Sequence, residues 1–134
     1  MRQVEDERDA TTGALVRREE RLEGVVDNLS AAVFLKDMEG RFLLINREFE
    51  RVFGVKRRDV IGMTAVESLA KAIAEALEPI GREVMESKTA RQTERTSVGA
   101  DGAPRSYRCV QFPVLDPEGE VHALGGIATD ITAN

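Results

Sequence analysis

The chain is poor in the residues that most often build catalytic and redox sites. Its 134 residues include one cysteine, one histidine, one tyrosine and no tryptophan. Cys109 has no partner for an internal disulfide, which is typical of a protein in a reducing compartment. His122, as the sole histidine, makes a Ser/His/Asp or Cys/His triad hard to assemble. We therefore expect a cytoplasmic protein that is not an enzyme.

Long apolar runs and a basic surface are also missing. No run approaches the roughly 18–20 apolar residues that a membrane-spanning helix needs. The polar N-terminus lacks the hydrophobic region of a signal peptide. A net charge of −5 gives no reason to expect nucleic acid as a partner. Apolar residues nevertheless make up 42% of the chain, which is enough for the core of one domain.

Residues 1–28 differ from the rest and predict one amphipathic helix. The segment is charged and free of proline, and Leu15, Leu22 and Leu29 recur every seven residues, with Val26 close to the same stripe. Such a repeat marks one face of a helix and, over several heptads, a coiled coil. Three leucines leave two alternatives open: a dimerising helix, or a helix lying on its own domain.

The remaining residues predict strands first, helices next and strands again. Apolar runs at 31–35 and 41–45 flank an Asp and a Gly, which predicts a β-hairpin. Asn46 is a good N-cap for a short helix that ends at Gly54. Residues 64–87 form the longest predicted helical stretch, which we expect Pro79 to kink or divide.

Three strands complete the pattern, at 90–98, 107–115 and 121–131, joined by turns with Asp and Gly. Strands joined by tight turns pair antiparallel, so the order predicts an α+β domain with its helices on one side of one sheet. Neither face of strand 107–115 is cleanly polar. We therefore expect both faces to be covered, the outer one by the N-terminal helix.

These residues resemble a known family. The stretch Val33–Gly54 (VFLKDMEGRFLLINREFERVFG) looks like the opening of a PAS domain, and Val60–Thr64 (VIGMT) is similar to the segment after its third helix. FPVLDPEGEV at 112–121 and GGIATDIT at 125–132 resemble its last two strands. The resemblance implies a PAS domain at 29–132, with a five-stranded antiparallel sheet in the order 2-1-5-4-3, helices on one face and the N-terminal helix outside.

The resemblance also implies a sensory role in signal transduction. PAS domains feed histidine kinases of two-component systems, cyclic-dinucleotide enzymes, phosphatases and transcription regulators, so we expect an effector domain outside this chain. Asp130 and Thr132 match the family's exit motif, in which the Asp anchors the junction to an output helix. We expect a homodimer to relay the signal. The residues expected at its interface are Leu15, Leu22, Val26, Val110, Phe112 and Ile127.

If the strands follow the family register, a ligand pocket lies between the sheet and the helices. Its expected lining is Phe34, Phe49, Phe53, Ile73, Leu77, Tyr107, Cys109, Leu124, Gly126 and Ala128. An apolar, acyl or aromatic small molecule suits such a lining. The alternative is that these side chains simply fill a core, and that the domain is a ligand-free dimerisation or docking module. Lys36 and Arg108 could pair with a carboxylate, but long cations on strands more often extend into water.

No cofactor or metal is expected. Haem-binding relatives carry an axial histidine on the helical side of the pocket, whereas His122 begins the last strand and is expected to be exposed. Photosensing flavin relatives carry a cysteine on a helix, but residues 64–69 contain none. Redox flavin relatives use Trp and Asn at the pocket, and this chain has no Trp. Gly125 and Gly126 lie inside a strand, which indicates close backbone approach rather than a phosphate-binding loop.

Overall fold

Helices and strands follow one another in the predicted order. The computed structural model describes residues 2–98 and 101–132. Its elements are α1 (Arg2–Asp27), β1 (Ala32–Lys36), β2 (Phe42–Ile45), α2 (Arg47–Phe53), α3 (Arg57–Val60), α4 (Ala65–Ser68), α5 (Lys71–Ser87), β3 (Arg91–Val98), β4 (Pro104–Leu115) and β5 (Val121–Asp130).

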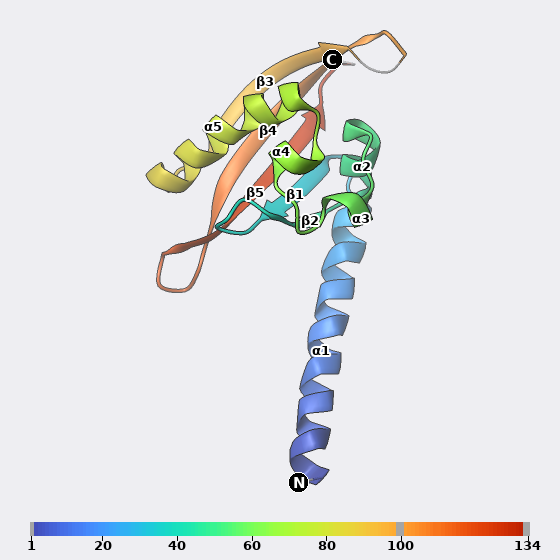
Figure 1. The fold of residues 1–134 in the computed structure, drawn as a ribbon, viewed down its shortest axis with the longest axis vertical. Coiled ribbons are helices and arrows are strands. Elements are labelled where there is room, and N and C mark those ends of the chain that lie inside the picture. Colours follow the sequence, from blue (N-terminus) through green and yellow to red (C-terminus); the bar gives the residue numbers. More distant parts are fainter. Residues whose placement is uncertain (1, 99–100, 133–134) are drawn as a thin grey trace.

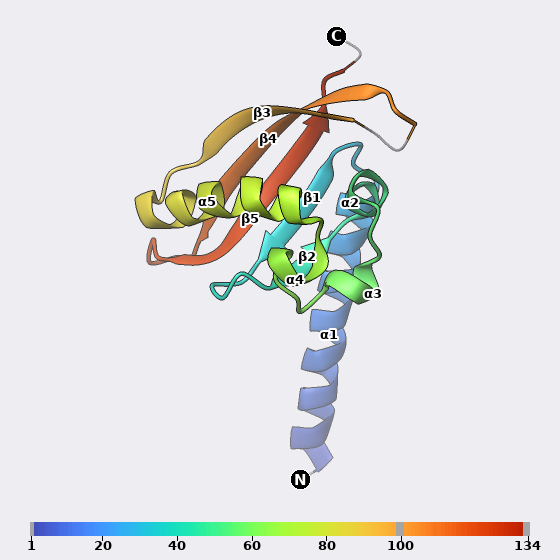
Figure 2. The same cartoon turned by 45° about the horizontal axis from the view of Figure 1, so that its top comes forward.

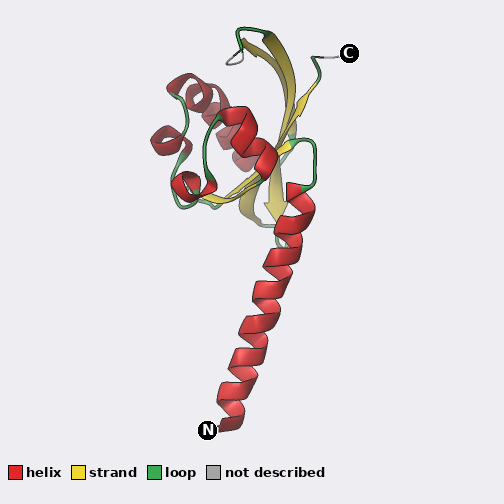
Figure 3. Ribbon diagram, turned by 90° about the vertical axis from the view of Figure 1, so that its right-hand side faces the viewer, coloured by secondary structure: helices red, strands yellow, loops and turns green. Residues whose placement is uncertain are grey.

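One antiparallel sheet organises the domain, and its strand order is β2-β1-β5-β4-β3. Helices α2 to α5 gather on one face of the sheet, whereas α1 points away from the domain (Figures 1 and 3). Figure 2 shows α5 lying across β4 and β5. The predicted α+β class, strand order and outside position of the N-terminal helix are confirmed.

The helices differ from the prediction in where the chain breaks. Helix α5 runs unbroken through Pro79, so the expected division there is wrong; the break lies at Leu69 and Ala70, between α4 and α5. Proline removes one backbone donor, which leaves the carbonyl four residues earlier without its helical partner. Glu75 and Pro79 are both exposed, so water can replace that bond. Helix α1, with 26 residues, is also longer than α5, with 17.

Asn46 connects three elements from a fully buried position. Its side-chain oxygen accepts from the backbone N–H of Phe49, as the N-cap of α2, and from that of Val33 on β1, both at 2.9 Å. Its amide donates to the carbonyls of Val26 in α1, at 2.7 Å, and of Ala31, at 2.8 Å. The predicted N-cap is confirmed. The same side chain also ties α1 to the sheet, and no local pattern predicts that contact.

Close backbone approach explains the two glycines of β5. A Cβ at Gly126 would overlap the ring of Phe34 on the helix side, and one at Gly125 would overlap the ring of Phe112 on the outer side. Phe34 also meets Phe42 and Phe49 edge to face, with ring centroids 5.8 and 6.1 Å apart. This aromatic cluster fills the centre of the space between sheet and helices.

Helix α1 does not cover the outer face of the sheet within one chain, so that expectation is wrong. Its end is fixed beside α2, where Asp27 accepts from the backbone N–H of Arg47 and pairs with the side chain of Arg57, both at 2.9 Å. These bonds set α1 at the edge of the domain, and the helix then extends away from it (Figure 1). The apolar outer face is left without a covering helix from the described part of the chain.

Replacing Asn46 with Ala is expected to destabilise the domain by about 3 kcal/mol. The change removes an N-cap and leaves buried backbone groups without partners. Urea unfolding followed by circular dichroism measures the loss. Asn28→Ala is the matched control, because Asn28 is exposed and bonds only within the end of α1. Equal stability of the two variants would contradict a structural role for Asn46.

Candidate functional site

A first cavity, the Cys109 cavity, lies between the start of α5, the end of α2 and the helix-facing side of β4 and β5. Its volume is about 230 Å³. Its lining is Val52, Phe53, Ile73, Leu77, Arg95, Ser97, Val98, Arg105, Tyr107, Cys109 and Ala128. The lining is therefore mostly apolar, with polar and basic groups supplied by β3 and β4. A partly enclosed space of this character suits a small apolar molecule with one polar end.

The predicted pocket residues are distributed over three places. Those that line the Cys109 cavity are Phe53, Ile73, Leu77, Tyr107, Cys109 and Ala128. Phe34 and Phe49 belong to the packed aromatic cluster, and the ring of Phe34 occupies the space over Gly126. Leu124 lines a different cavity near the β1–β2 turn. The expected single pocket is thus two cavities, with the aromatic cluster between them.

The Cys109 side chain is half-buried in the first cavity. Burial raises the pKa of the Cys109 thiol, while the charge of Arg95 opposes this more weakly. The thiolate is the reactive form of cysteine, so a raised pKa keeps the sulfur unreactive at neutral pH. Cys109 therefore acts as a small apolar wall residue here.

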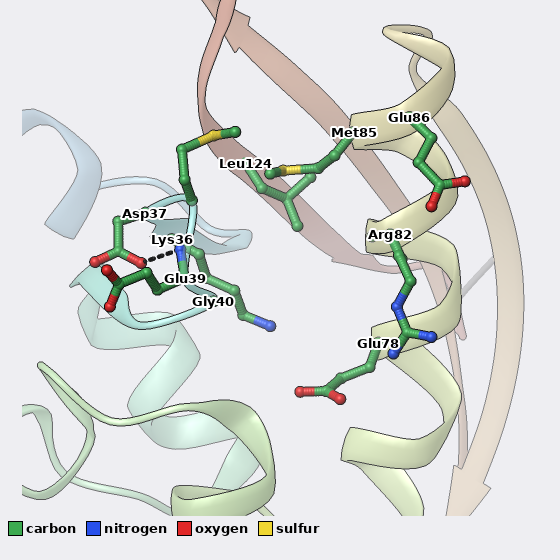
Figure 4. Close-up of a pocket in the computed structure, with 11 residues that line it drawn as sticks. Lys36, Asp37, Glu39, Gly40, Glu78, Arg82, Met85, Glu86 and Leu124 are labelled. Atoms are coloured by element: carbon green, nitrogen blue, oxygen red, sulfur yellow. Dashed lines mark hydrogen bonds between the residues drawn. The ribbon is translucent and has the colours of Figure 1, made fainter.

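The second cavity, the Lys36 cavity, has a volume of about 390 Å³ and lies between the β1–β2 turn and the later half of α5 (Figure 4). It is lined by residues 36–40 together with Glu78, Gly81, Arg82, Met85, Glu86 and Leu124. Gly81 allows the helix to approach the sheet, because a Cβ there would lie 2.8 Å from a Leu124 methyl group and 2.9 Å from the amide oxygen of Gln111. Lys36 forms the sheet-side wall.

Lys36 is only 6% exposed, so the expectation that it extends into water is wrong. Inward positions alternate along β1 at Ala32, Phe34 and Lys36, and strand geometry therefore turns the lysine toward the helices. Its ammonium lies 5.4 Å from the Phe34 ring centroid and 4.9 Å from that of Phe42. Burial lowers the pKa of Lys36, and the charge of Glu78 opposes that shift. Arg108, in contrast, is exposed as expected.

Several residues of the second cavity were not among the predicted site residues. Glu78, Arg82 and Met85 are spaced four and three residues apart on the side of α5 that lines this cavity. They are not part of the apolar stripe that predicted the helix. Gln111 is 3% exposed and donates from its amide to the carbonyl of Leu77, at 3.1 Å. The polar residue among apolar neighbours in β4 was the available signal for Gln111. For Lys36 the signal was the period of two along β1.

The predicted exit residues form a closed hydrogen-bonded junction at the end of β5. Asp130 accepts from the backbone N–H of Thr132, and the Thr132 hydroxyl accepts from the backbone N–H of Ser106, both at 2.8 Å. Hydrogen bonding from Thr132 is the main cause that lowers the pKa of the Asp130 carboxyl. The junction fixes the direction in which the chain leaves the sheet.

The predicted interface residues of the sheet lie side by side on its outer face. Val110 and Ile127 are directly paired between β4 and β5, and Val33 of β1 lies opposite Ile127. Phe112 packs over Gly125 in the same row of strands. In α1, Leu22 is 54% exposed and Val26 is half-buried, while the side chain of Leu15 lies outside the described residues.

Other candidate chemistry finds no cluster in the structure. His122 is exposed on β5, as predicted. Among residues 2–98 and 101–132, no three acidic, histidine or cysteine side chains lie close enough together to hold a metal ion. Within the same ranges, no helix combines the length and apolar character needed to cross a membrane.

An antiparallel 2-1-5-4-3 sheet with helices on one face and cavities between them defines a sensor-type α+β domain. The sequence matches the family described as PAS fold over residues 26–134. The chain belongs to the PAS-fold family.

Known relatives agree with this assignment. The chain is 25% identical over 123 residues to the methanogenesis regulatory histidine kinase FilI of Methanothrix harundinacea, and 29% identical over 110 residues to a diguanylate cyclase of Vibrio cholerae. The matches cover 88% and 81% of this chain but only 13% and 34% of those proteins. The chain therefore spans only a minor part of the length of each of these two relatives.

Solved structures share the fold. The PAS domain of BvgS from Bordetella pertussis is 26% identical, with a TM-score of 0.71, and the match covers 87% of this chain and 88% of that one. VqmA of Vibrio cholerae, in a complex with ligand and DNA, is 22% identical, with a TM-score of 0.72 over 84% of this chain and 51% of that one. The VqmA likeness concerns the fold alone.

Replacing Lys36 with Met is expected to stabilise the protein by about 1–2 kcal/mol at pH 7. A buried charge without an ion-pair partner costs more than its contacts with aromatic rings return, and Met packs well against aromatic rings. Because the pKa of Lys36 is lowered in the folded state, its cost is greatest below that pKa and disappears as the pH rises to the ordinary value of 10.5.

Thermal unfolding of wild type and Lys36→Met between pH 7 and pH 10.5 tests this prediction. The gain in stability should shrink as the pH rises. Lys71→Met is the control, because the Lys71 side chain is 90% exposed on α5. A gain that is the same at every pH, or that Lys71→Met reproduces, would contradict a buried charge at Lys36.

Proposed function

We propose that this chain is the sensory module of a cytoplasmic signalling protein, without catalytic activity or a cofactor of its own. It binds a small apolar or acyl molecule in the Cys109 cavity and passes the signal to an effector domain outside the chain. The observation that carries the proposal is a partly enclosed, mostly apolar cavity of about 230 Å³ against the helix-facing side of the sheet. The histidine kinase and diguanylate cyclase relatives support a kinase or cyclase as the effector.

The proposed relay runs from the cavity to the exit of the chain along β4 and β5. Ala128 and Tyr107 line the cavity, and Tyr107 is paired with Asp130 of the exit junction. A ligand that changes the packing of these strands would therefore act on a junction only two residues away. If the two strands and the junction have two alternative packings, a ligand transmits a signal only when it binds one of these packings more tightly than the other.

A homodimer is the second part of the proposal. The outer face presents an apolar row in which Ile127 is 36% exposed, and Leu22 in α1 and Leu29 just after α1 are also exposed. Contiguous apolar surface of this kind marks an interaction site. We infer that two copies cover each other's outer faces, with α1 of each chain taking part.

A ligand-free dimerisation or docking module is the second candidate. It is favoured by the aromatic cluster, because the rings of Phe34, Phe42 and Phe49 fill the centre of the fold. The space beside them, near Phe34 and Cys109, is only about 20 Å³. In this alternative the Cys109 cavity stays empty and the outer face alone carries the function.

Native mass spectrometry of the purified protein tests the ligand. The wild type should retain a small-molecule mass, and Ala128→Leu should not, because the larger side chain fills the Cys109 cavity. Ala72→Leu is the control, since Ala72 is exposed on α5. A bare protein mass for the wild type would favour the docking module. Retention by Ala128→Leu would remove the Cys109 cavity as the binding site.

Light scattering tests the dimer. The wild type should have about twice the chain mass of 14.8 kDa, and Ile127→Glu should be a monomer, because a buried carboxylate at an apolar interface is costly. His122→Glu is the matched control on the same strand, at an exposed position outside the apolar row. A dimer that survives Ile127→Glu would exclude this face as the interface.

A further inference from the structure

The Lys36 cavity contains a cation that has no partner. Lys36 is 6% exposed, and its ammonium, which keeps some contact with solvent, makes no ion pair or hydrogen bond with any residue in the described ranges. In Figure 4 the ammonium points from the sheet into the space toward α5. The neighbouring carboxylate of Asp37 is engaged elsewhere, because it accepts from the backbone N–H groups of Glu39, at 2.8 Å, and Arg41, at 3.0 Å.

The opposite wall supplies a second cation. Arg82 lines the same space from α5, and its side chain runs along the helix toward Glu78, whose carboxylate reaches toward Lys36 (Figure 4). Neither side chain forms an ion pair within residues 2–98 and 101–132. Glu78 acts on Lys36 only through its charge. The two cations therefore line one space of about 390 Å³, and in the described part of the chain neither lies within ion-pair distance of a carboxylate.

The rest of the lining restricts the shape and charge of a ligand. Met85 and Leu124 give the space an apolar floor, and Gly81 adds no side chain to it. Glu39 and Glu86 are exposed on its lining, and Glu78 lies within it. With Asp37 the lining carries four carboxylates against two cations, so a dianion or phosphate would meet more repulsion than a ligand with a single negative charge.

We propose that the Lys36 cavity binds a small organic monocarboxylate. The carboxylate accepts hydrogen bonds from the Lys36 ammonium and the Arg82 guanidinium, and the short apolar body lies on Met85 and Leu124. Charge-assisted hydrogen bonds of this kind are among the strongest in proteins, and they return the free energy lost when Lys36 is buried. The site is separate from the Cys109 cavity and does not depend on a ligand there.

The test uses hexanoate as the probe, with hexanol and succinate as its neutral and dianionic counterparts. Isothermal titration of Ala128→Leu, in which the Cys109 cavity is filled, should detect hexanoate but neither counterpart. In ¹H–¹⁵N spectra, hexanoate should shift the amides of residues 36–40 and 81–85. Lys36→Met should weaken binding about tenfold or more, the loss of one charge-assisted hydrogen bond. Lys71→Met, which changes an exposed lysine on α5, should bind hexanoate like the wild type.

Two further variants keep the result decisive. Arg82→Gln changes an exposed residue and leaves the core intact, so it should weaken hexanoate binding independently of any change at Lys36. Ala128→Leu should leave hexanoate binding unchanged, whereas loss in that variant alone would assign the acid to the Cys109 cavity. Equal binding by Lys36→Met, or equal binding of succinate and hexanoate, would overturn the proposal.

Discussion

The fold depends on one buried amide. Asn46 is the point at which α1, β1 and α2 meet, and its side chain uses both of its polar atoms to bond backbone groups of all three. A buried polar group is tolerated only when it is bonded in this way. Because the bonded groups come from separate elements, the direction of α1 relative to the sheet is fixed by hydrogen bonds rather than by apolar packing. The salt bridge between Asp27 and Arg57 acts on the same joint.

The register of β1 against β5 divides the interior. Phe34 lies opposite Gly126, so its ring fills the middle of the fold, where a side chain on β5 would otherwise stand. Lys36, two residues further along β1, lies opposite Leu124. Its cavity is on the other side of the Phe34 ring from the Cys109 cavity. The same pairing therefore places an apolar cavity toward one end of α5 and a charged one toward the other. A one-residue shift of register would exchange the faces and remove both.

Local signals such as short apolar runs, turn residues and an N-cap were sufficient for the order of helices and strands and for the hairpins, whereas the strand order came from the resemblance to PAS domains. Asn46 and Gly54 illustrate this, since each acts at the helix end where its chemistry predicts it. The position of α1 and the division of the pocket depend on long-range contacts instead. Asn46 reaches a carbonyl 20 residues away, and the ring of Phe34 covers a glycine 92 positions later in the chain. No window of local sequence contains such information.

Lys36 shows how a general preference for solvated cations is overridden by geometry. Buried and half-buried positions alternate along β1, and Ala32 and Phe34 face the core. Lys36, two positions after Phe34, therefore faces the core as well. An aliphatic residue would fill that position at lower cost, since burial works against the charged form of Lys36. Helix α5 forms one wall of each cavity, through Ile73 and Leu77 at one end and Arg82 and Met85 at the other. A molecule held in either cavity would therefore press on the same helix, which gives two chemically different ligands one common element to move.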